Sequence, residues 1–249
     1  MNTTFSDYVA IGQRRLYAEW SGEGTPVIVL DAGGPGAGCS TGAWNMIWFE
    51  LAGLSSVCRF DRANSGRSDS AGLPRTSRDM VEDLRLMLAA AGFAPPFLLV
   101  GHSFGGLNMQ LFARLYPLET ARLVLIDSVH PDQIERFYTH SQAAGDSLRS
   151  ETEAVLQGVD WDASAIQVKT APPLTSPPLT VISRGRPTPE AAIWSELQAD
   201  LAAQSPDSRH LIAPNSGHGI QMDEPLVVIV AISDLVRRLR VPAATPPLI

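Results

Sequence analysis

Ser103 has the sequence setting best suited to covalent chemistry. It lies in Gly101-His102-Ser103-Phe104-Gly105, which follows the pattern G-x-S-x-G. The apolar run at 97–100 predicts a buried strand before it, and apolar residues at helical spacing over 107–115 predict a helix after it. A sharp strand-to-helix turn exposes such a serine in a strained backbone, at the positive end of a helix. The two glycines remove side chains where strand and helix pass close together. This context predicts a nucleophile rather than a surface serine in a tight turn.

His218 is the predicted partner of this serine. A serine hydroxyl needs a base to take its proton, and histidine is the usual base near neutral pH. His218 lies between two glycines just after the last predicted strand, at the sheet edge where α/β enzymes meet their ligands. His102 is expected to point away from Ser103 and to be structural. The other histidines have no motif around them: His130, His140 and His210. A histidine in a surface loop is the alternative for His218.

The elements that must position these residues alternate along the chain. Apolar runs predict strands at 26–30, 56–60, 97–100, 121–126, 179–183 and 209–213, after a hairpin at 5–22. Helical spacing predicts helices near 42–54, 76–91, 107–115, 189–204 and 226–239. This rhythm predicts an α/β fold, with a mostly parallel central sheet of about eight strands and helices on both faces.

Residues 128–178 interrupt this rhythm. Two helices are predicted there, near 131–143 and 145–158, followed by a proline-rich exit. We expect a small helical cap insertion over the strand ends, within a single domain that covers 1–249.

Composition narrows the classes of partner. The 249 residues are 45% hydrophobic with net charge −7, and Lys169 is the only lysine. The absence of a basic run argues against nucleic acid or an anionic membrane surface as a partner. No apolar run reaches membrane-span length, and the first seven residues carry no secretory pattern, so a cytoplasmic location is expected.

Cys39 and Cys58 match no metal spacing. The glycines at 33–38 lack the lysine of a P-loop and the G-x-G-x-x-G spacing. We therefore expect no metal, no cofactor and a small-molecule partner, with the chain a monomer or homodimer.

The sequence resembles the α/β-hydrolase superfamily over nearly its full length. Five segments carry the likeness in the family's order: 33–36, 61–68, 101–106, 123–127 and 216–218. The resemblance implies that Ser103 is the nucleophile and His218 the base. It also implies that the amides of Phe104 and Gly34 form the oxyanion hole, although Ala32 stands where the family has histidine. The loop 61–68 resembles the family's D-x-x-G-x-G-x-S and is expected to be structural.

The acid of the triad is left open between several carboxylates. In many relatives the acid follows the strand that is here 179–183, but this chain has no carboxylate there until Glu190. Other relatives place the acid at the end of the strand after the elbow helix, which is Asp127 here. A carboxylate at that position would accept the imidazole N–H of His218 and fix its tautomer. We favour Asp127, with Glu190, Asp132 or a weakened dyad as alternatives, and with a turn cap as the structural reading of Asp127.

These residues favour a serine hydrolase that cleaves a carboxylic ester, lactone or thioester through an acyl-enzyme. An amidase or C–C bond hydrolase would use the same triad, and a non-catalytic small-ligand receptor is the alternative from another class. A serine nucleophile argues against the related dehalogenases and epoxide hydrolases, which use an aspartate. Four aromatic side chains either line the substrate pocket or pack in the interior: Phe137, Tyr138, Trp161 and Trp194.

Overall fold

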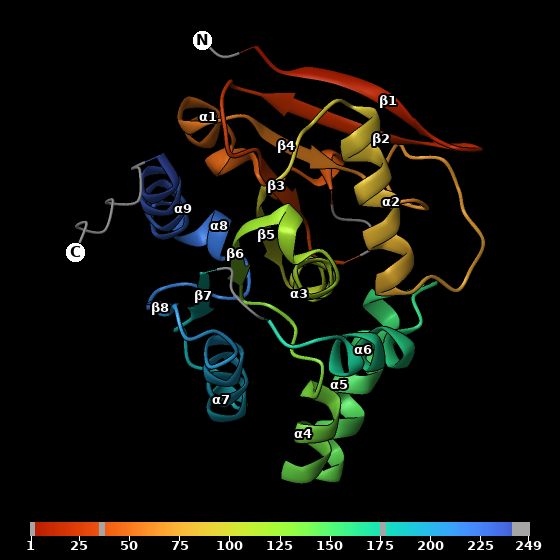
Figure 1. Ribbon diagram of the computed structural model, residues 1–249. Helices are drawn as coiled ribbons and strands as arrows, with labels where there is room; N and C mark the ends of the chain where they lie inside the picture. Colours follow the sequence, from red (N-terminus) through yellow and green to blue (C-terminus); the bar gives the residue numbers. More distant parts are fainter. Residues whose placement is uncertain (1–2, 35–37, 175–177, 241–249) are drawn as a thin grey trace, which may run out of the picture.

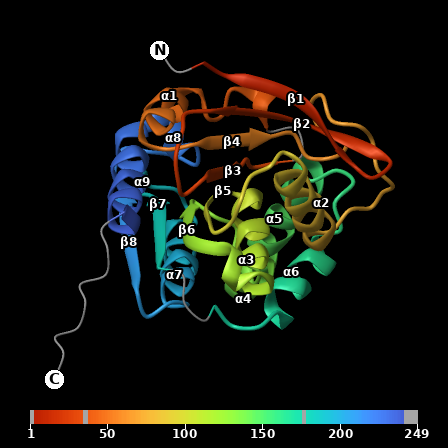
Figure 2. The ribbon, with the colours of Figure 1, turned by 45° about the horizontal axis from the view of Figure 1, so that its top comes forward.

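The computed structural model describes residues 3–34, 38–174 and 178–240, and these residues contain one eight-stranded sheet (Figures 1 and 2). The strand order is β1-β2-β4-β3-β5-β6-β7-β8. β2 pairs antiparallel with β1 and β4, and every other pair is parallel. The sheet therefore confirms the predicted α/β fold. The strands are β1 Phe5–Ile11, β2 Arg14–Ser21, β3 Ile28–Asp31, β4 Val57–Phe60, β5 Phe97–His102, β6 Thr120–Ile126, β7 Leu179–Arg184 and β8 Ser208–Ala213.

Helices cover both faces of the sheet, and Figure 2 shows α2 and α9 on opposite sides of the central strands. The helices outside the insertion are α1 Asn45–Leu54, α2 Ser77–Ala90, α3 Phe104–Leu115, α7 Ala191–Ala202, α8 Ile220–Asp223 and α9 Pro225–Arg240. Two short 3-10 turns, η1 Cys39–Thr41 and η2 Pro117–Glu119, complete this part of the chain. The short helix α8 was not predicted, because a single turn has no apolar periodicity to reveal it.

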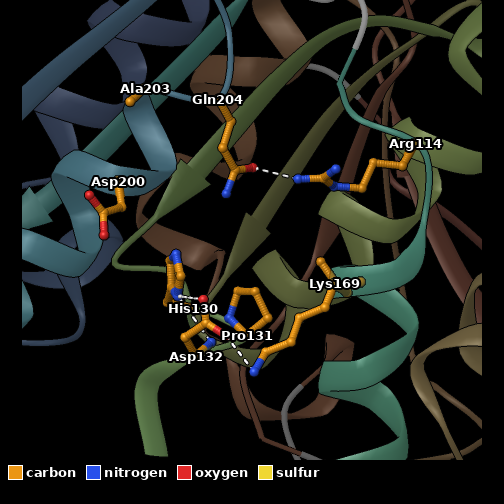
Figure 3. Close-up of a pocket in the computed structure, with 9 residues that line it drawn as sticks. Arg114, His130, Pro131, Asp132, Lys169, Asp200, Ala203 and Gln204 are labelled. Carbon is orange, nitrogen blue, oxygen red and sulfur yellow. Dashed lines mark hydrogen bonds and ion pairs between the residues drawn. The ribbon is translucent and has the colours of Figure 1, made fainter. Parts of the chain in front are cut away.

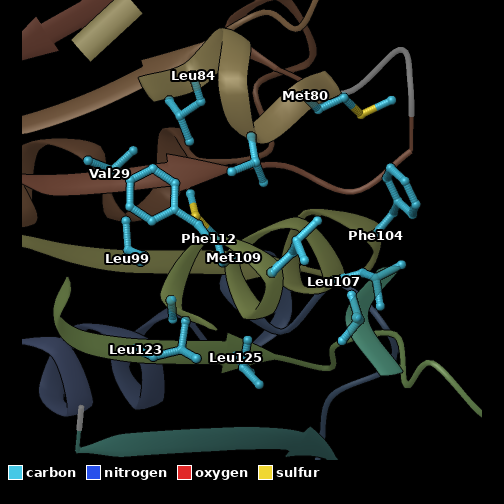
Figure 4. Packing of buried hydrophobic residues seen from close by; sticks show 14 of the residues in the cluster. Val29, Met80, Leu84, Leu99, Phe104, Leu107, Met109, Phe112, Leu123 and Leu125 are labelled. Carbon is cyan, nitrogen blue, oxygen red and sulfur yellow. The ribbon is translucent and has the colours of Figure 1, made fainter. Parts of the chain in front are cut away.

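The central strands bury both of their faces. Ile28 and Leu98 belong to the apolar cluster under α1 and α9, whereas their chain neighbours Val29 and Leu99 belong to the cluster under α2 and α3. Figure 4 shows Phe112 of α3 beside Val29 and Leu99. Side chains alternate between the faces of a strand, so a strand covered on both sides must be apolar throughout. This is why these strands appear in the sequence as continuous apolar runs.

Three helices form the insertion between β6 and β7, gathered at one end of the molecule (Figure 1). They are α4 Gln133–His140, α5 Gln142–Val155 and α6 Trp161–Thr170. The prediction of two helices was incomplete because it left out α6. The signal for α6 was nevertheless present: Asp160 caps its first turn by accepting from Ala163 N–H at 2.9 Å, and Trp161, Ala165 and Val168 are buried at helical spacing.

The insertion is tied to the segment that precedes α2. The N–H of Arg75 donates to the carbonyl of Gly158 at 2.8 Å, and the carbonyl of Arg75 accepts from the N–H of Asp160 at 2.8 Å. The N–H of Ser77 donates to Oγ of Ser164 at 2.9 Å. These bonds fix the base of α6 to the main domain on the side away from β7. Among the helices of the described residues, none is long and apolar enough to cross a bilayer.

Candidate active site

Ser103 occupies the turn between β5 and α3 in a backbone conformation that is rare for a non-glycine residue. Its φ is 54° and its ψ is −123°. The N–H of Ser103 donates to the carbonyl of Ile126 at 3.1 Å, and its own carbonyl accepts from the N–H groups of Gly106 and Val129 at 2.9 and 3.1 Å. Bonds to β6 and to the residues after it therefore hold the strained turn. The strained conformation predicted from the G-x-S-x-G pattern is confirmed.

Close packing around the turn requires glycine at two positions. A Cβ on Gly101 would lie 2.5 Å from the carbonyl oxygen of Gly105. A Cβ on Gly105 would lie 2.2 Å from the carbonyl oxygen of Asp31, at the end of β3. Both distances are shorter than any van der Waals contact, so the predicted close passage of strand and helix is confirmed.

His218 and Asp127, which are far apart in sequence, meet beyond the ends of the strands. Nδ1 of His218 lies 2.6 Å from Oδ2 of Asp127, which is the first residue after β6. Asp127 is fully buried, and its Oδ1 accepts from Nε1–H of Trp194 at 2.7 Å and from the backbone N–H of Arg184 at 3.1 Å. With Nδ1–H donated to the carboxylate, Nε2 is left as the basic nitrogen of His218.

The surroundings of Asp127 stabilise its charge. Burial by itself raises the pKa of this carboxyl, but the hydrogen bond and charge of His218, followed by the charge of Arg184 and the Trp194 N–H, lower the pKa below its ordinary value overall. Asp127 is therefore ionised near neutral pH and can hold a protonated imidazole.

The other carboxylates considered as the acid lie elsewhere. Glu190 precedes the first residue of α7 and lines the same cavity as His218, whereas the carboxylate bonded to His218 is that of Asp127. Asp132 forms an ion pair with Lys169. The geometry therefore brings together Ser103, His218 and Asp127 and leaves Glu190 on the cavity wall.

The side chain of His102 bonds to the backbone of His218. Nε2–H of His102 donates to the carbonyl oxygen of His218 at 2.8 Å, and the two ring centroids are 4.6 Å apart. Burial, followed by the nearby His218, lowers the pKa of His102 to about 3, so the ring is neutral near pH 7. His102 thus holds the loop of His218 in place, in keeping with its expected structural part. His210 and His130 bond elsewhere, to Ser183 Oγ and to the Asp132 N–H.

A cavity of about 630 Å³ lies over these residues. Ser103, His218, Gly33, Gly34 and Phe104 line it on the side of the sheet. Side chains of α4, α5, α6 and the turn after α5 line the opposite side, which is mainly apolar; among them are Phe137, Leu148, Val155, Leu156 and Trp161. Of the four aromatic residues singled out in the sequence, three line this cavity. Tyr138 is the exception, since it packs on Gly145 and donates to Asp146 at 3.0 Å.

The two amides expected to form an oxyanion hole both lie on the cavity wall with Ser103. Phe104 is the first residue of α3, so its N–H has no carbonyl partner within the helix. The loop that carries Gly34 approaches Ser103 closely, since a Cβ on Gly33 would lie 3.3 Å from Cβ of Ser103. A Cβ on Gly34 would touch Cγ1 of Val155 at 3.0 Å, which shows how closely α5 covers this loop. Residues 35–37, which complete the glycine-rich segment, lie outside the described residues.

Sequence reasoning missed the parts played by Arg184 and Trp194. The Arg184 guanidinium lies 3.5 Å from Oδ2 of Asp127 and 4.4 Å from the ring centroid of Trp194. Arg184 stands at the end of β7, where many relatives carry the acid. The sequence signal was therefore an arginine where a carboxylate was expected, but only the fold shows that this cation reaches Asp127.

A second, more open cavity of about 550 Å³ lies between the insertion and α7 (Figure 3). Its charged groups contact protein atoms: Arg114 donates to Gln204 Oε1 at 2.9 Å, and Lys169 pairs with Asp132. Within the described part of the chain, no group of three or more histidine, cysteine, aspartate or glutamate side chains is arranged to hold a metal ion.

Residues 26–172 match a family model described as the alpha/beta hydrolase fold. The chain belongs to this family. It is 28% identical over 214 residues to YqjL, an uncharacterised protein of Bacillus subtilis, with 84% of this chain and 82% of that protein covered. It is 32% identical over 145 residues to the pimeloyl-[acyl-carrier protein] methyl ester esterase of Chromobacterium violaceum, covering 58% and 51% of the two chains. Alpha/beta hydrolase domain-containing protein 10 from mouse has a similar structure, with a TM-score of 0.75 at 17% identity over 94% of this chain and 99% of that one. The expected family and fold of this alpha/beta hydrolase are thus confirmed.

Proposed function

We propose that this alpha/beta hydrolase cleaves a carboxylic ester, lactone or thioester of a small molecule, with Ser103, His218 and Asp127 as its catalytic triad. The observation that carries the proposal is the 2.6 Å contact between His218 Nδ1 and Asp127 Oδ2, next to a cavity that both His218 and Ser103 line. This arrangement supplies a nucleophile, a base and an orienting acid at one site.

The reaction starts when Ser103 Oγ attacks the carbonyl carbon of the substrate. His218 Nε2 takes the hydroxyl proton, and Asp127 stabilises the imidazolium that forms. The carbonyl oxygen becomes an oxyanion that accepts hydrogen bonds from the amides of Phe104 and Gly34. Collapse of this intermediate breaks the bond to the leaving alcohol or thiol, which receives the proton from His218. Water then attacks the acyl-enzyme by the same route and releases the acid.

The cavity supports a small organic substrate rather than a polymer. Its volume of about 630 Å³ falls within the range of drug-sized ligand pockets. The apolar side chains of α4, α5 and α6 would contact the hydrocarbon part of the substrate, whereas the reacting carbonyl would lie against the polar wall at Ser103. The esterase of Chromobacterium violaceum among the relatives agrees with an ester as substrate.

The test is a pre-steady-state assay with p-nitrophenyl acetate and butyrate. We expect a burst of p-nitrophenol of about one equivalent per active site, followed by slower turnover, and loss of both in Ser103→Ala. The exposed Ser70 supplies the matched control, and Ser70→Ala should retain the burst.

Other outcomes identify the alternative activities. Turnover of aryl amides or of vinylogous C–C substrates, without ester turnover, would replace the ester assignment by an amidase or C–C hydrolase with the same triad. Saturable ligand binding with no burst and no turnover would instead favour a receptor on this scaffold. A burst that survives in Ser103→Ala would remove Ser103 from the reaction.

A further inference from the structure

Arg62 is buried beneath the glycine-rich loop and bonds to three consecutive carbonyl groups of the chain. Nη1 donates to the carbonyl of Ala32 at 2.8 Å, and Nη2 donates to the carbonyls of Gly33 and Gly34, the latter at 2.7 Å. Arg62 is only 3% exposed. The planar guanidinium presents its donors as a rigid fork, so it constrains the direction of all three peptide groups at once.

The direction of these carbonyls determines the direction of the neighbouring amides. In a trans peptide the C=O of one residue and the N–H of the next point in opposite directions. Because the carbonyl of Gly33 points to the buried Arg62, the N–H of Gly34 points away from it, toward the cavity that Gly33 and Gly34 line. Two adjacent glycines permit many backbone conformations, so without a constraint this peptide could rotate and present its carbonyl to the cavity.

The same network reaches the other expected oxyanion donor. Arg62 forms an ion pair with Asp31, whose second oxygen accepts from Nδ2 of Asn108 at 2.9 Å. Asn108 belongs to α3, one turn after Phe104, and the guanidinium carbon lies 5.8 Å from the centroid of the Phe104 ring. Asp31 and Asn108 are both buried. A single buried network thus joins the glycine-rich loop to the start of α3.

We infer that Arg62 is the positioning residue of the oxyanion hole: it holds the Gly33–Gly34 peptide with its N–H toward the substrate and fixes this loop relative to α3. The inference rests on the proposed function, because an oxyanion forms only if Ser103 attacks a carbonyl. Ala32 has no side-chain donor to hold the loop, which leaves this task to Arg62 from the loop 61–68. That loop, expected only to be structural, therefore acts on the site through its arginine.

The test centres on a variant that neutralises both partners of the buried ion pair. Removing Arg62 alone would leave Asp31 buried without its partner, so the informative variant is the double substitution Asp31→Asn with Arg62→Gln. Asp31→Asn alone, which retains the guanidinium, is its reference. Arg62→Lys keeps the charge but not the planar fork. Arg67→Gln is the matched control, because Arg67 lies in the same loop and contacts Tyr17 and Glu19 instead.

Two measurements are made on each folded variant: steady-state hydrolysis of p-nitrophenyl acetate, and a crystal structure of the glycine-rich loop. Loss of one oxyanion donor lowers kcat by about 100-fold or more. We therefore expect the double variant to fall about 100-fold in kcat below Asp31→Asn, with KM changed less than about threefold, and Arg62→Lys to be intermediate. In its crystal structure the Gly33–Gly34 peptide should be rotated or should lack one defined orientation.

An unchanged peptide orientation in the double variant would overturn the inference, whatever its activity. So would a kcat within about threefold of Asp31→Asn together with an intact elbow. If the wild-type protein shows no ester hydrolysis, the proposed function fails, whereas the crystal structures still decide whether Arg62 orients the loop.

Discussion

The guanidinium of Arg184 lies 3.5 Å from Oδ2 of Asp127, the same oxygen that Nδ1 of His218 contacts at 2.6 Å. The carboxylate of Asp127 therefore contacts the permanent positive charge of Arg184 as well as the imidazole of His218. Burial raises the pKa of the Asp127 carboxyl. The hydrogen bond and charge of His218 lower this pKa, and the charge of Arg184 lowers it further. A cation in this place weakens the attraction of the Asp127–His218 pair for the proton that the proposed mechanism transfers to His218.

Substitution of Arg184 should shift the pH dependence of hydrolysis. In Arg184→Gln the Asp127–His218 pair binds its proton more tightly, so less of the enzyme has a free base at a given pH. We expect the acid limb of the kcat/KM profile to move to higher pH. Arg186→Gln is the control from the segment directly after β7, because Arg186 donates to the carbonyl of Asn215 at 2.7 Å and is largely exposed. A shift to lower pH in Arg184→Gln would contradict this account.

The identity of the acid is tested by two matched amide substitutions. Asp127→Asn keeps the shape but loses the charge that stabilises the imidazolium, so kcat should fall by roughly three to four orders of magnitude. Glu190→Gln alters only the cavity wall, and its kcat should stay within about tenfold of wild type. The measurement is steady-state hydrolysis of p-nitrophenyl butyrate. Wild-type rates in Asp127→Asn would remove this residue from the triad.

His102 should make the stability of the protein depend on pH. Its pKa is about 3 in the folded protein, against 6.5 ordinarily, so between these values the unfolded chain binds more protons. The contribution of His102 is complete above pH 6.5 and is lost as pH falls toward 3, at up to about 1.4 kcal/mol per pH unit. Between pH 7 and pH 5 this amounts to about 2 kcal/mol of the free energy of unfolding.

Urea unfolding at pH 7 and pH 5 measures this effect. His102→Gln should lose less stability than wild type between the two pH values, whatever its stability at pH 7. His140→Gln, at an exposed histidine of α4, should keep the wild-type difference. Equal losses in His102→Gln and wild type would show that His102 does not carry the dependence.

The glycine of the elbow and a glycine of α1 should respond in opposite ways to alanine. A Cβ on Gly105 would lie 2.2 Å from the Asp31 carbonyl oxygen, so Gly105→Ala should reduce the free energy of unfolding by about 3 kcal/mol or more. Gly53 is exposed within α1, and a Cβ there meets nothing within 4 Å. Gly53→Ala should therefore stabilise the protein by about 0.5–1 kcal/mol. Thermal unfolding of both variants checks the pair, and a neutral Gly105→Ala would refute the close passage of α3 over β3.

The sequence by itself was sufficient for the strands of the described residues, for their helices other than α6 and α8, and for the elbow. Apolar runs predict β3, β5 and β6 because a strand covered on both faces must be apolar at every position. The glycines around Ser103 predict the sharp turn because larger residues do not fit there. Asn64 stands at the first glycine of the D-x-x-G-x-G-x-S pattern, and its φ of 67° is a conformation that asparagine tolerates. Each of these inferences uses residue types and their spacing within a short segment, so it could be made without knowing which distant segments those residues contact.

Only the tertiary structure decided how the ends of distant strands meet. The sequence left the partner of His218 open between Asp127 and Glu190, because the choice depends on where β6, β7 and the loop after β8 end relative to one another. The approach of Arg184 to Asp127 and of Arg62 to the glycine-rich loop likewise depends on strand order, since each contact joins segments about 30 or more residues apart. Neither contact leaves a periodic signal in the sequence. Each is made by a single side chain beyond the carboxyl ends of the strands, and a single residue has no repeat by which it could be recognised.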